Sequence, residues 1–200
     1  MILSKSQHEI LNLIYHYPGI RLTELIKKAR ISANTAKKNI SILLNRAIIK
    51  EEKIIGGKRI ILKRFYPSFS TEEGKNIFSL IELEKTNEFF KKNKSLKGPF
   101  KQLLENIGDT FQIILIFGSF ASNSQTSDSD LDILFLAEKE IDRNILKKEI
   151  ERSFITFNQE ISPRIDTLDS FKNNLNKDIY QTIIKNHVII KGAINFIEIL

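Results

Sequence analysis

The sequence predicts an α+β protein made of two domains joined by a helix. In the first 46 residues, apolar side chains recur every three or four positions, as they do on one face of a helix. Apolar runs then bracket Gly56-Gly57, and two further runs, 113–117 and 131–136, lie on either side of a polar stretch. These observations predict an N-terminal domain at 1–66, a linking helix at 67–98, and a C-terminal domain at 99–200 in which helices flank a small mixed β-sheet.

The net charge of +7 is unevenly distributed along the 200 residues. Residues 1–65 hold 14 Lys and Arg against 4 Asp and Glu, a balance of +10. The remaining residues hold 17 against 20, a balance of −3. This asymmetry predicts that the N-terminal domain binds a polyanion.

Composition also excludes several kinds of site. The chain has no cysteine, so disulfides, thiolate zinc sites and cysteine nucleophiles are ruled out. His8, His16 and His187 are scattered without metal-ligand spacing, which favours surface or half-buried positions for them. There is no apolar run of about 18 residues and no signal-peptide pattern, so we expect a soluble, cytoplasmic protein that does not bind membranes.

Three short helices and a hairpin are expected in the N-terminal domain. The helices are predicted at Ser4–Tyr17, at about 22–29, and from Ala33 to about Arg46 with Ser32 as N-cap. The hairpin is predicted from Ala47–Lys50 and Lys58–Arg64, with its turn at Gly56-Gly57.

This order of three helices and a basic hairpin resembles a winged helix-turn-helix domain. The resemblance implies that the third helix enters the major groove of double-stranded DNA and that the hairpin is the wing. The expected DNA contacts are Asn34 and Thr35 for base edges, Ser41 on the same helix face, and Lys37, Lys38, Arg46, Lys58 and Arg59 for phosphates. A protein-docking surface, or a lysine-rich face that is only solvated, is the alternative.

The linking region is expected to be helical. Ser70 to Glu73 has the pattern of a capping box and predicts a helix to about Asn93. That helix has apolar residues on more than one side, so we expect it to pack on both domains or on a second copy in a homodimer. A basic loop, Lys91–Gly98, and a helix, Phe100–Ile107 after Pro99, are expected next.

A candidate site lies where the two apolar runs of the C-terminal domain meet the polar stretch. The first run ends at Gly118-Ser119, and the second begins with Asp130 and Asp132. Side chains two apart in a strand point to the same face, so the two carboxylates project together and suit a hard cation such as Mg²⁺. Gly118 allows the backbone to approach a phosphate closely, and Ser119 adds a hydroxyl group.

Gly118-Ser119, the Asp130-Leu-Asp132 pair and the polar spacing between them resemble the signature of the nucleotidyltransferase superfamily related to DNA polymerase β, in its minimal branch. The resemblance covers roughly the second half of the chain. It implies that the carboxylates bind two Mg²⁺ ions and that a nucleoside triphosphate, with ATP expected, is attacked at its α-phosphate by an acceptor hydroxyl. Many members have Arg-Gly where this chain has Ser122-Asn123; Asn tolerates left-handed conformations much as Gly does, but the missing Arg removes a phosphate contact.

The family also implies a third carboxylate, on a strand predicted at Phe157–Thr167 after a helix at about 142–154. Glu160 and Asp166 are both candidates. Glu160 is preferred because Glu160-Ile-Ser-Pro163 resembles the carboxylate, aliphatic residue and nearby proline of several relatives. Asp166 is alternatively the cap of the helix that follows. A helix at about 176–185, a strand at 188–190 and a terminal helix after Gly192 are expected to close the chain.

The sequence therefore predicts a DNA-binding protein with a Mg²⁺-dependent nucleotidyltransferase domain that transfers a nucleoside monophosphate to an unidentified acceptor. Minimal nucleotidyltransferases are often paired with a small helical toxin, so the resemblance implies a protein acceptor such as a cognate toxin. The alternative is a winged-helix transcriptional regulator whose second domain is inactive or only senses nucleotide.

Overall fold

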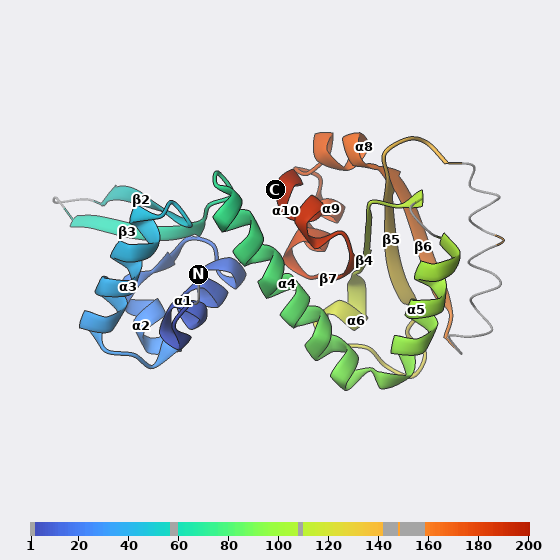
Figure 1. The fold of residues 1–200 in the computed structure, drawn as a ribbon, viewed down its shortest axis with the longest axis horizontal. Helices are drawn as coiled ribbons and strands as arrows, with labels where there is room; N and C mark the ends of the chain where they lie inside the picture. The colour runs from blue at the N-terminus through green and yellow to red at the C-terminus, as the bar shows by residue number, and fades with distance from the viewer. Residues whose placement is uncertain (1–2, 57–59, 108–109, 142–147, 149–158) are drawn as a thin grey trace. The chain divides into compact units, whose positions relative to one another are not determined.

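The computed structural model describes residues 3–56, 60–107, 110–141, 148 and 159–200. The chain divides into two compact units, Met1–Ile81 and Glu82–Ile199, and the boundary falls inside one long helix (Figure 1). None of the helices in the described part of the chain combines the length and the apolar character needed to cross a bilayer.

The first unit contains three helices and a three-stranded antiparallel sheet. The helices are α1 (Lys5–His16), α2 (Leu22–Ala29) and α3 (Ala33–Asn45), and the strands are β1 (Ile20–Arg21), β2 (Ile49–Gly56) and β3 (Ile60–Pro67) in the order β1-β3-β2. The predicted helices are confirmed. Ser4 caps α1 in a capping box with Gln7, and Ser32 caps α3 by accepting a hydrogen bond from the Thr35 N–H (3.1 Å).

The predicted hairpin is present, but its strands are longer than the sequence suggested. The register pairs Ile49 with Pro67 and continues to Gly56 with Ile60. Backbone pairing therefore carries β2 through a charged stretch, 50–53, which the apolar pattern did not mark as strand. The two-residue strand β1 was not predicted at all, because two residues are too few to show a period. Lys58, Arg59 and the second glycine of the predicted turn lie outside the described residues.

Helix α4 (Glu72–Lys92) confirms the predicted linking helix and corrects its start. The predicted capping box at Ser70–Glu73 is wrong. The Ser70 hydroxyl shares a hydrogen bond with Ser68 (2.9 Å), and Thr71 instead caps the helix by accepting from the Gly74 N–H (3.1 Å).

Each half of α4 packs into its own unit, as its apolar residues on several sides predicted. In the first unit the ring of Phe78 stacks on Tyr15, with 5.2 Å between the centroids. In the second unit the Thr86 hydroxyl donates to the Ile189 carbonyl (2.6 Å), and Phe89 is buried. The homodimer stays a prediction.

Helix α5 (Lys94–Ile107) begins where a basic loop was expected, so the predicted loop at Lys91–Gly98 is wrong, and Pro99 lies inside the helix. Leu96 is buried in the same cluster as Phe100 and Leu103, at helical spacing. Burial of this side chain favours the additional helical turn over the break that proline usually causes.

The second unit is built on a mixed four-stranded sheet, as predicted. Its strands are β4 (Ile113–Ile116), β5 (Leu131–Ala137), β6 (Ile161–Thr167) and β7 (Val188–Lys191), in the order β6-β5-β4-β7. Strands β5 and β6 are parallel, whereas β4 is antiparallel to both of its neighbours. The described helices around the sheet are α5, α6 (Gly118–Ser122), α8 (Leu168–Asn173), α9 (Asp178–Lys185) and α10 (Ala193–Ile199).

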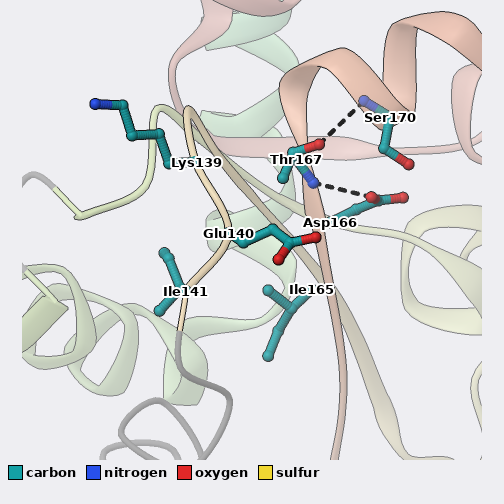
Figure 2. A pocket seen from close by; sticks show the side chains of 7 residues that line it. All are labelled: Lys139, Glu140, Ile141, Ile165, Asp166, Thr167 and Ser170. Atoms are coloured by element: carbon teal, nitrogen blue, oxygen red, sulfur yellow. Dashed lines mark hydrogen bonds between the residues drawn. The ribbon is translucent and has the colours of Figure 1, made fainter.

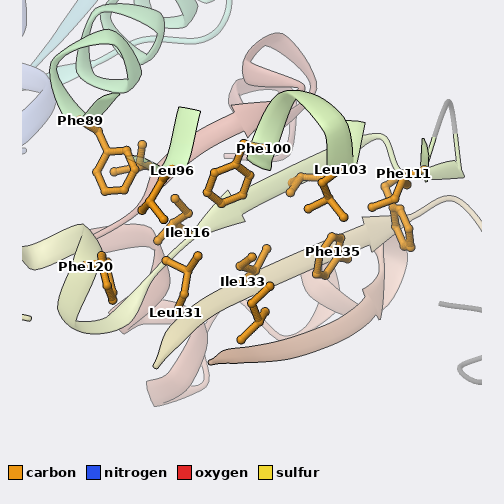
Figure 3. Packing of buried hydrophobic residues seen from close by; sticks show 14 of the residues in the cluster. Phe89, Leu96, Phe100, Leu103, Phe111, Ile116, Phe120, Leu131, Ile133 and Phe135 are labelled. Atoms are coloured by element: carbon orange, nitrogen blue, oxygen red, sulfur yellow. The ribbon is translucent and has the colours of Figure 1, made fainter. Parts of the chain in front are cut away.

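Alternate residues of β5 enter two different cores. Ile133 and Phe135 pack with Phe100 and Leu103 of α5 (Figure 3). Leu134 and Leu136 pack on the other face of the sheet with residues of α8, α9 and α10. The predicted helix at 142–154 lies outside the described residues, apart from residue 148.

His187 is buried rather than at the surface or half-buried as expected, with 3% of its area exposed. Its Nδ1 lies 3.0 and 2.9 Å from the carbonyl oxygens of Ile183 and Ile184, so Nδ1 carries a proton. Its Nε2 lies 3.1 Å from Oε1 of the buried Glu82. This contact joins α4 to the segment between α9 and β7.

Candidate active site

Asp130 and Asp132 lie at the start of β5, where the strand emerges from the core. Asp130 is exposed and Asp132 is partly buried. Burial raises the pKa of Asp132 above its ordinary value, the charge of Asp130 raises it further, and a hydrogen bond from Ser162 offsets part of the rise. Two carboxylates that repel each other at a partly buried position are stabilised by a cation between them.

Gly118 packs directly against the carboxylate of Asp132. Its φ is +67°, and a Cβ atom placed there would lie 2.1 Å from Asp132 Oδ2. The Phe117 N–H also donates to the Asp132 carbonyl (3.0 Å). The sequence predicted that glycine was needed for close approach to a phosphate, whereas in the structure the close neighbour is a carboxylate. Any side chain at position 118 would displace this carboxylate.

Backbone and hydroxyl hydrogen bonds hold the short helix that begins at Gly118 and the turn after it. Ser119 is half-buried at the start of α6, and its carbonyl accepts from the Ser124 N–H (2.9 Å). The Ser122 hydroxyl donates to the Gly118 carbonyl (3.0 Å), and Asn123 has a φ of +54°. Asn123 therefore adopts the left-handed conformation at the position where the resembling family often has Gly, as expected from the sequence.

The strand register separates the two candidates for the third carboxylate. Leu131 pairs with Ile161, and the Leu131 N–H donates to the Glu160 carbonyl (2.7 Å), so the exposed Glu160 lies level with Asp130. Asp166 pairs with Leu136 instead. At about 3.3 Å per residue, four further residues along β6 place Asp166 roughly 13 Å beyond the level of Asp132.

Asp166 also has partners of its own. It lines a cleft of about 230 Å³ with Glu140, Thr167 and Ser170, among others (Figure 2). Burial alone would raise its pKa, but hydrogen bonds from Tyr180, Ser170 and the Thr167 N–H outweigh burial and lower the pKa. The N-cap of α8 is Thr167, whose hydroxyl accepts from the Ser170 N–H (3.1 Å), so the interpretation of Asp166 as that cap is wrong.

The carboxylate pair fits a divalent cation. Mg²⁺ is typically held by one or two carboxylates together with phosphate oxygens and water, and the lack of a side chain at Gly118 leaves the space that the Asp132 carboxylate occupies. Among the residues that the structure describes, no three His, Cys, Asp or Glu side chains are grouped closely enough to hold a metal. The pair thus provides part of a metal site that phosphate ligands would complete.

The predicted DNA contacts of α3 share one face of the helix. Asn34, Lys37, Lys38 and Ser41 are exposed, whereas Thr35 is half-buried with its hydroxyl 2.8 Å from that of Ser32. A cleft of about 360 Å³ lies beside this face, lined in part by side chains of the hairpin.

Arg46 occupies a different environment from these residues. It forms an ion pair with Glu73, and the hydrogen bond from Arg46 lowers the pKa of Glu73. This carboxylate partly neutralises the guanidinium group before any phosphate is bound.

Comparison with known proteins identifies the second part of the chain. Residues 100–193 match the family model described as polymerase beta, nucleotidyltransferase, and the matched range contains Gly118, Asp130 and Asp132. This match supports a nucleotidyltransferase domain of the polymerase β type in residues 100–193, where the motifs indicated it. A solved structure described as "Crystal structure of the toxin-antitoxin with AMP-PNP" is similar over 50% of this chain and 77% of that chain, with 21% identity and a TM-score of 0.40. No curated protein matches the chain.

Substitution of Gly118 by Ala should weaken divalent cation binding about 10- to 100-fold, because the new methyl group would displace the Asp132 carboxylate. Mn²⁺ binding followed by electron paramagnetic resonance measures this effect. Gly98→Ala is the matched control, since a Cβ there meets nothing within 4 Å. Unchanged Mn²⁺ affinity in Gly118→Ala would contradict the proposed need for close packing.

Substitution of Tyr180 by Phe should destabilise the second unit at neutral pH by about 1 kcal/mol, a value reduced by solvent screening of Asp166. Because the pKa of Asp166 is lowered in the folded protein, its stabilising contribution is present above the unfolded-state pKa of about 3.9 and is lost as pH falls through the folded value. The difference in the free energy of unfolding between Tyr180→Phe and the parent should therefore become smaller at acidic pH. Urea unfolding at several pH values measures this difference.

Tyr66→Phe is the control for this measurement. Its hydroxyl makes the same kind of hydrogen bond, to Glu52 (2.8 Å), at the surface of the first unit, so its loss should leave unfolding almost unchanged. A Tyr180→Phe effect of constant size across the pH range would show that Asp166 is not involved.

Proposed function

We propose that the protein is a metal-dependent nucleotidyltransferase that transfers a nucleoside monophosphate from a triphosphate to an acceptor hydroxyl, and that its first unit is a winged helix-turn-helix domain that binds double-stranded DNA. The observation that carries the enzymatic part is the packing of Gly118 on Asp132, next to Asp130, within the matched domain.

In this proposal Asp130 and Asp132 hold two Mg²⁺ ions, and Glu160 is the third carboxylate of the site, although in the structure the three are not grouped closely enough to hold one metal together. When bound, the ions would stabilise negative charge on the α-phosphate and on the leaving pyrophosphate. The level position of Glu160 beside Asp130 supports its assignment over Asp166. Gly118 and Ser119, at the start of α6, are proposed to orient the triphosphate, for which ATP is expected.

The proposed reaction forms a bond between the acceptor oxygen and the α-phosphorus and breaks the bond from that phosphorus to the bridging oxygen of pyrophosphate. In this proposal Glu160 accepts the proton of the acceptor hydroxyl. Asp130 and Glu160 are both exposed, which supports access by a macromolecular acceptor. The proposed acceptor is a hydroxyl group of a partner protein, such as a cognate toxin.

The DNA-binding part rests on charge and on the faces of α3. Its buried face includes Ala36, Ile40 and Leu43, so the exposed face formed by Asn34, Lys37, Lys38 and Ser41 is free to enter a groove. The balance of +10 over residues 1–65 supports contact with phosphates. Thr35, Lys58 and Arg59 are further proposed contacts.

The runner-up function is transcriptional regulation by a protein whose second unit is inactive or only senses nucleotide. Ser122-Asn123 in place of Arg-Gly favours this alternative, because it removes a cation from the phosphate site.

Asp130→Asn should abolish transfer while leaving DNA binding intact. The test is mass spectrometry of the full chain incubated with ATP or another nucleoside triphosphate, Mg²⁺ and a cell extract, in search of a protein whose mass has increased by one nucleotide. Asp128→Asn is the matched control, because Asp128 is an exposed acid two residues away on the same loop.

Two outcomes of this experiment would contradict the enzymatic proposal. The first is that neither the parent nor Asp128→Asn modifies any species or binds a triphosphate. The second is that Asp130→Asn retains the activity of the parent. DNA binding without any transfer would favour the regulator.

Replacement of Lys37 and Lys38 together by Ala should weaken DNA binding and make its dependence on salt shallower by about 2 in the logarithmic slope, because each phosphate contact releases about one counterion. Fluorescence anisotropy at several salt concentrations measures both quantities. The control is the replacement of both Lys94 and Lys97 by Ala. These two lysines are exposed, and their replacement removes the same charge from the second unit. Equal effects in the two double variants would contradict the groove assignment.

A further inference from the structure

The start of β6 contacts the segment that carries the two aspartates at three successive levels. The Gln159 side-chain amide donates to the Ser129 carbonyl, immediately before Asp130. The Leu131 N–H then donates to the Glu160 carbonyl (2.7 Å), and Ser162 lies opposite Asp132 in the β5–β6 register, where its hydroxyl lowers the pKa of the Asp132 carboxyl group. Two of these three contacts come from side chains, and both reach the carboxylate segment.

The backbone that makes these contacts is anchored in the apolar core. Ile161, between the two side chains, is 4% exposed and pairs with the fully buried Leu131. The backbone of 159–162 is therefore fixed relative to β5. Gln159 and Ser162 are themselves only partly buried, so their polar groups contribute little to the apolar core.

Asp130 has few other restraints of its own. It precedes the first residue of β5 and is exposed, and the loop before it has turns closed by short-range bonds such as that from the Thr126 N–H to the Ser129 hydroxyl (2.9 Å). The repulsion between two carboxylates would push this end of the loop away from Asp132. The hydrogen bond from Gln159 to the Ser129 carbonyl opposes that displacement.

We infer that Gln159 and Ser162 are positioning residues of the cation site: Gln159 fixes the backbone next to Asp130, and Ser162 fixes the carboxylate of Asp132. The inference rests on the proposed function, because it assumes that the two aspartates bind the cation. Groups that orient metal ligands typically change metal affinity about 10- to 100-fold when they are removed.

The test compares Mn²⁺ affinity and thermal stability in full-length variants. Gln159→Ala and Ser162→Ala should each weaken Mn²⁺ binding by about tenfold or more, with little change in the unfolding temperature. Ser162→Thr keeps the hydroxyl and should restore most of the affinity. Gln181→Ala is the matched control, since its amide makes the same kind of bond, to the Leu175 carbonyl (2.6 Å), away from the aspartates.

Three other results would contradict either this inference or the proposed function. Parent-like Mn²⁺ affinity in both alanine variants would overturn this inference and leave the proposed function standing. An equal loss in Gln181→Ala would show that the effect is only one of stability, which also overturns the inference. Failure of the parent to bind Mn²⁺ would overturn the proposed function and this inference with it.

Discussion

The site depends on the close packing of the Asp132 carboxylate between a glycine and a neighbouring strand. There is no room for even a methyl group on Gly118 beside this carboxylate, and Ser162 of β6 lies opposite Asp132 in the strand register. The strand that bears Asp132 is itself fixed by two cores, one on each face of the sheet. The partly buried carboxylate of Asp132 is therefore held in place by packing before any ligand binds, with the exposed Asp130 beside it, which is the form of preorganisation that a cation site needs.

The two units differ in charge and in the kind of site that they contain. Positive charge is concentrated in the first unit, where α3 exposes two lysines and an asparagine on one face. The second unit contains the carboxylates and has a slightly negative balance of charge. This separation suits a protein that binds one polyanion for location and another, a nucleoside triphosphate, for chemistry. The proposed roles differ in their physical basis: the first relies on exposed, screened charges, and the second on a carboxylate, Asp132, that is held by packing.

Much of this architecture could be predicted from local patterns, whereas the details of the site could not. Apolar periodicity indicated the helices of the first unit and the mixed sheet of the second, and the Gly118 to Asp132 spacing indicated the nucleotidyltransferase domain. The start of α5 was missed because burial of Leu96 outweighs the usual effect of Pro99. The choice between Glu160 and Asp166 depends on the β5–β6 register, which joins residues about 30 positions apart and leaves no periodic trace in the sequence. The contact between Gly118 and Asp132 is equally non-local, so the sequence did not indicate that this glycine also packs against a carboxylate.

The most direct test of the central claim is electron paramagnetic resonance of the full-length protein with Mn²⁺ and a non-hydrolysable nucleoside triphosphate analogue. The account predicts that the analogue tightens Mn²⁺ binding and that two bound ions show spin coupling, because the carboxylate pair and the phosphates would share them at the short separation typical of two-metal sites, about 4 Å. Mn²⁺ binding that is absent, or that is unaffected by both the analogue and the loss of the Asp130 carboxylate, would contradict it.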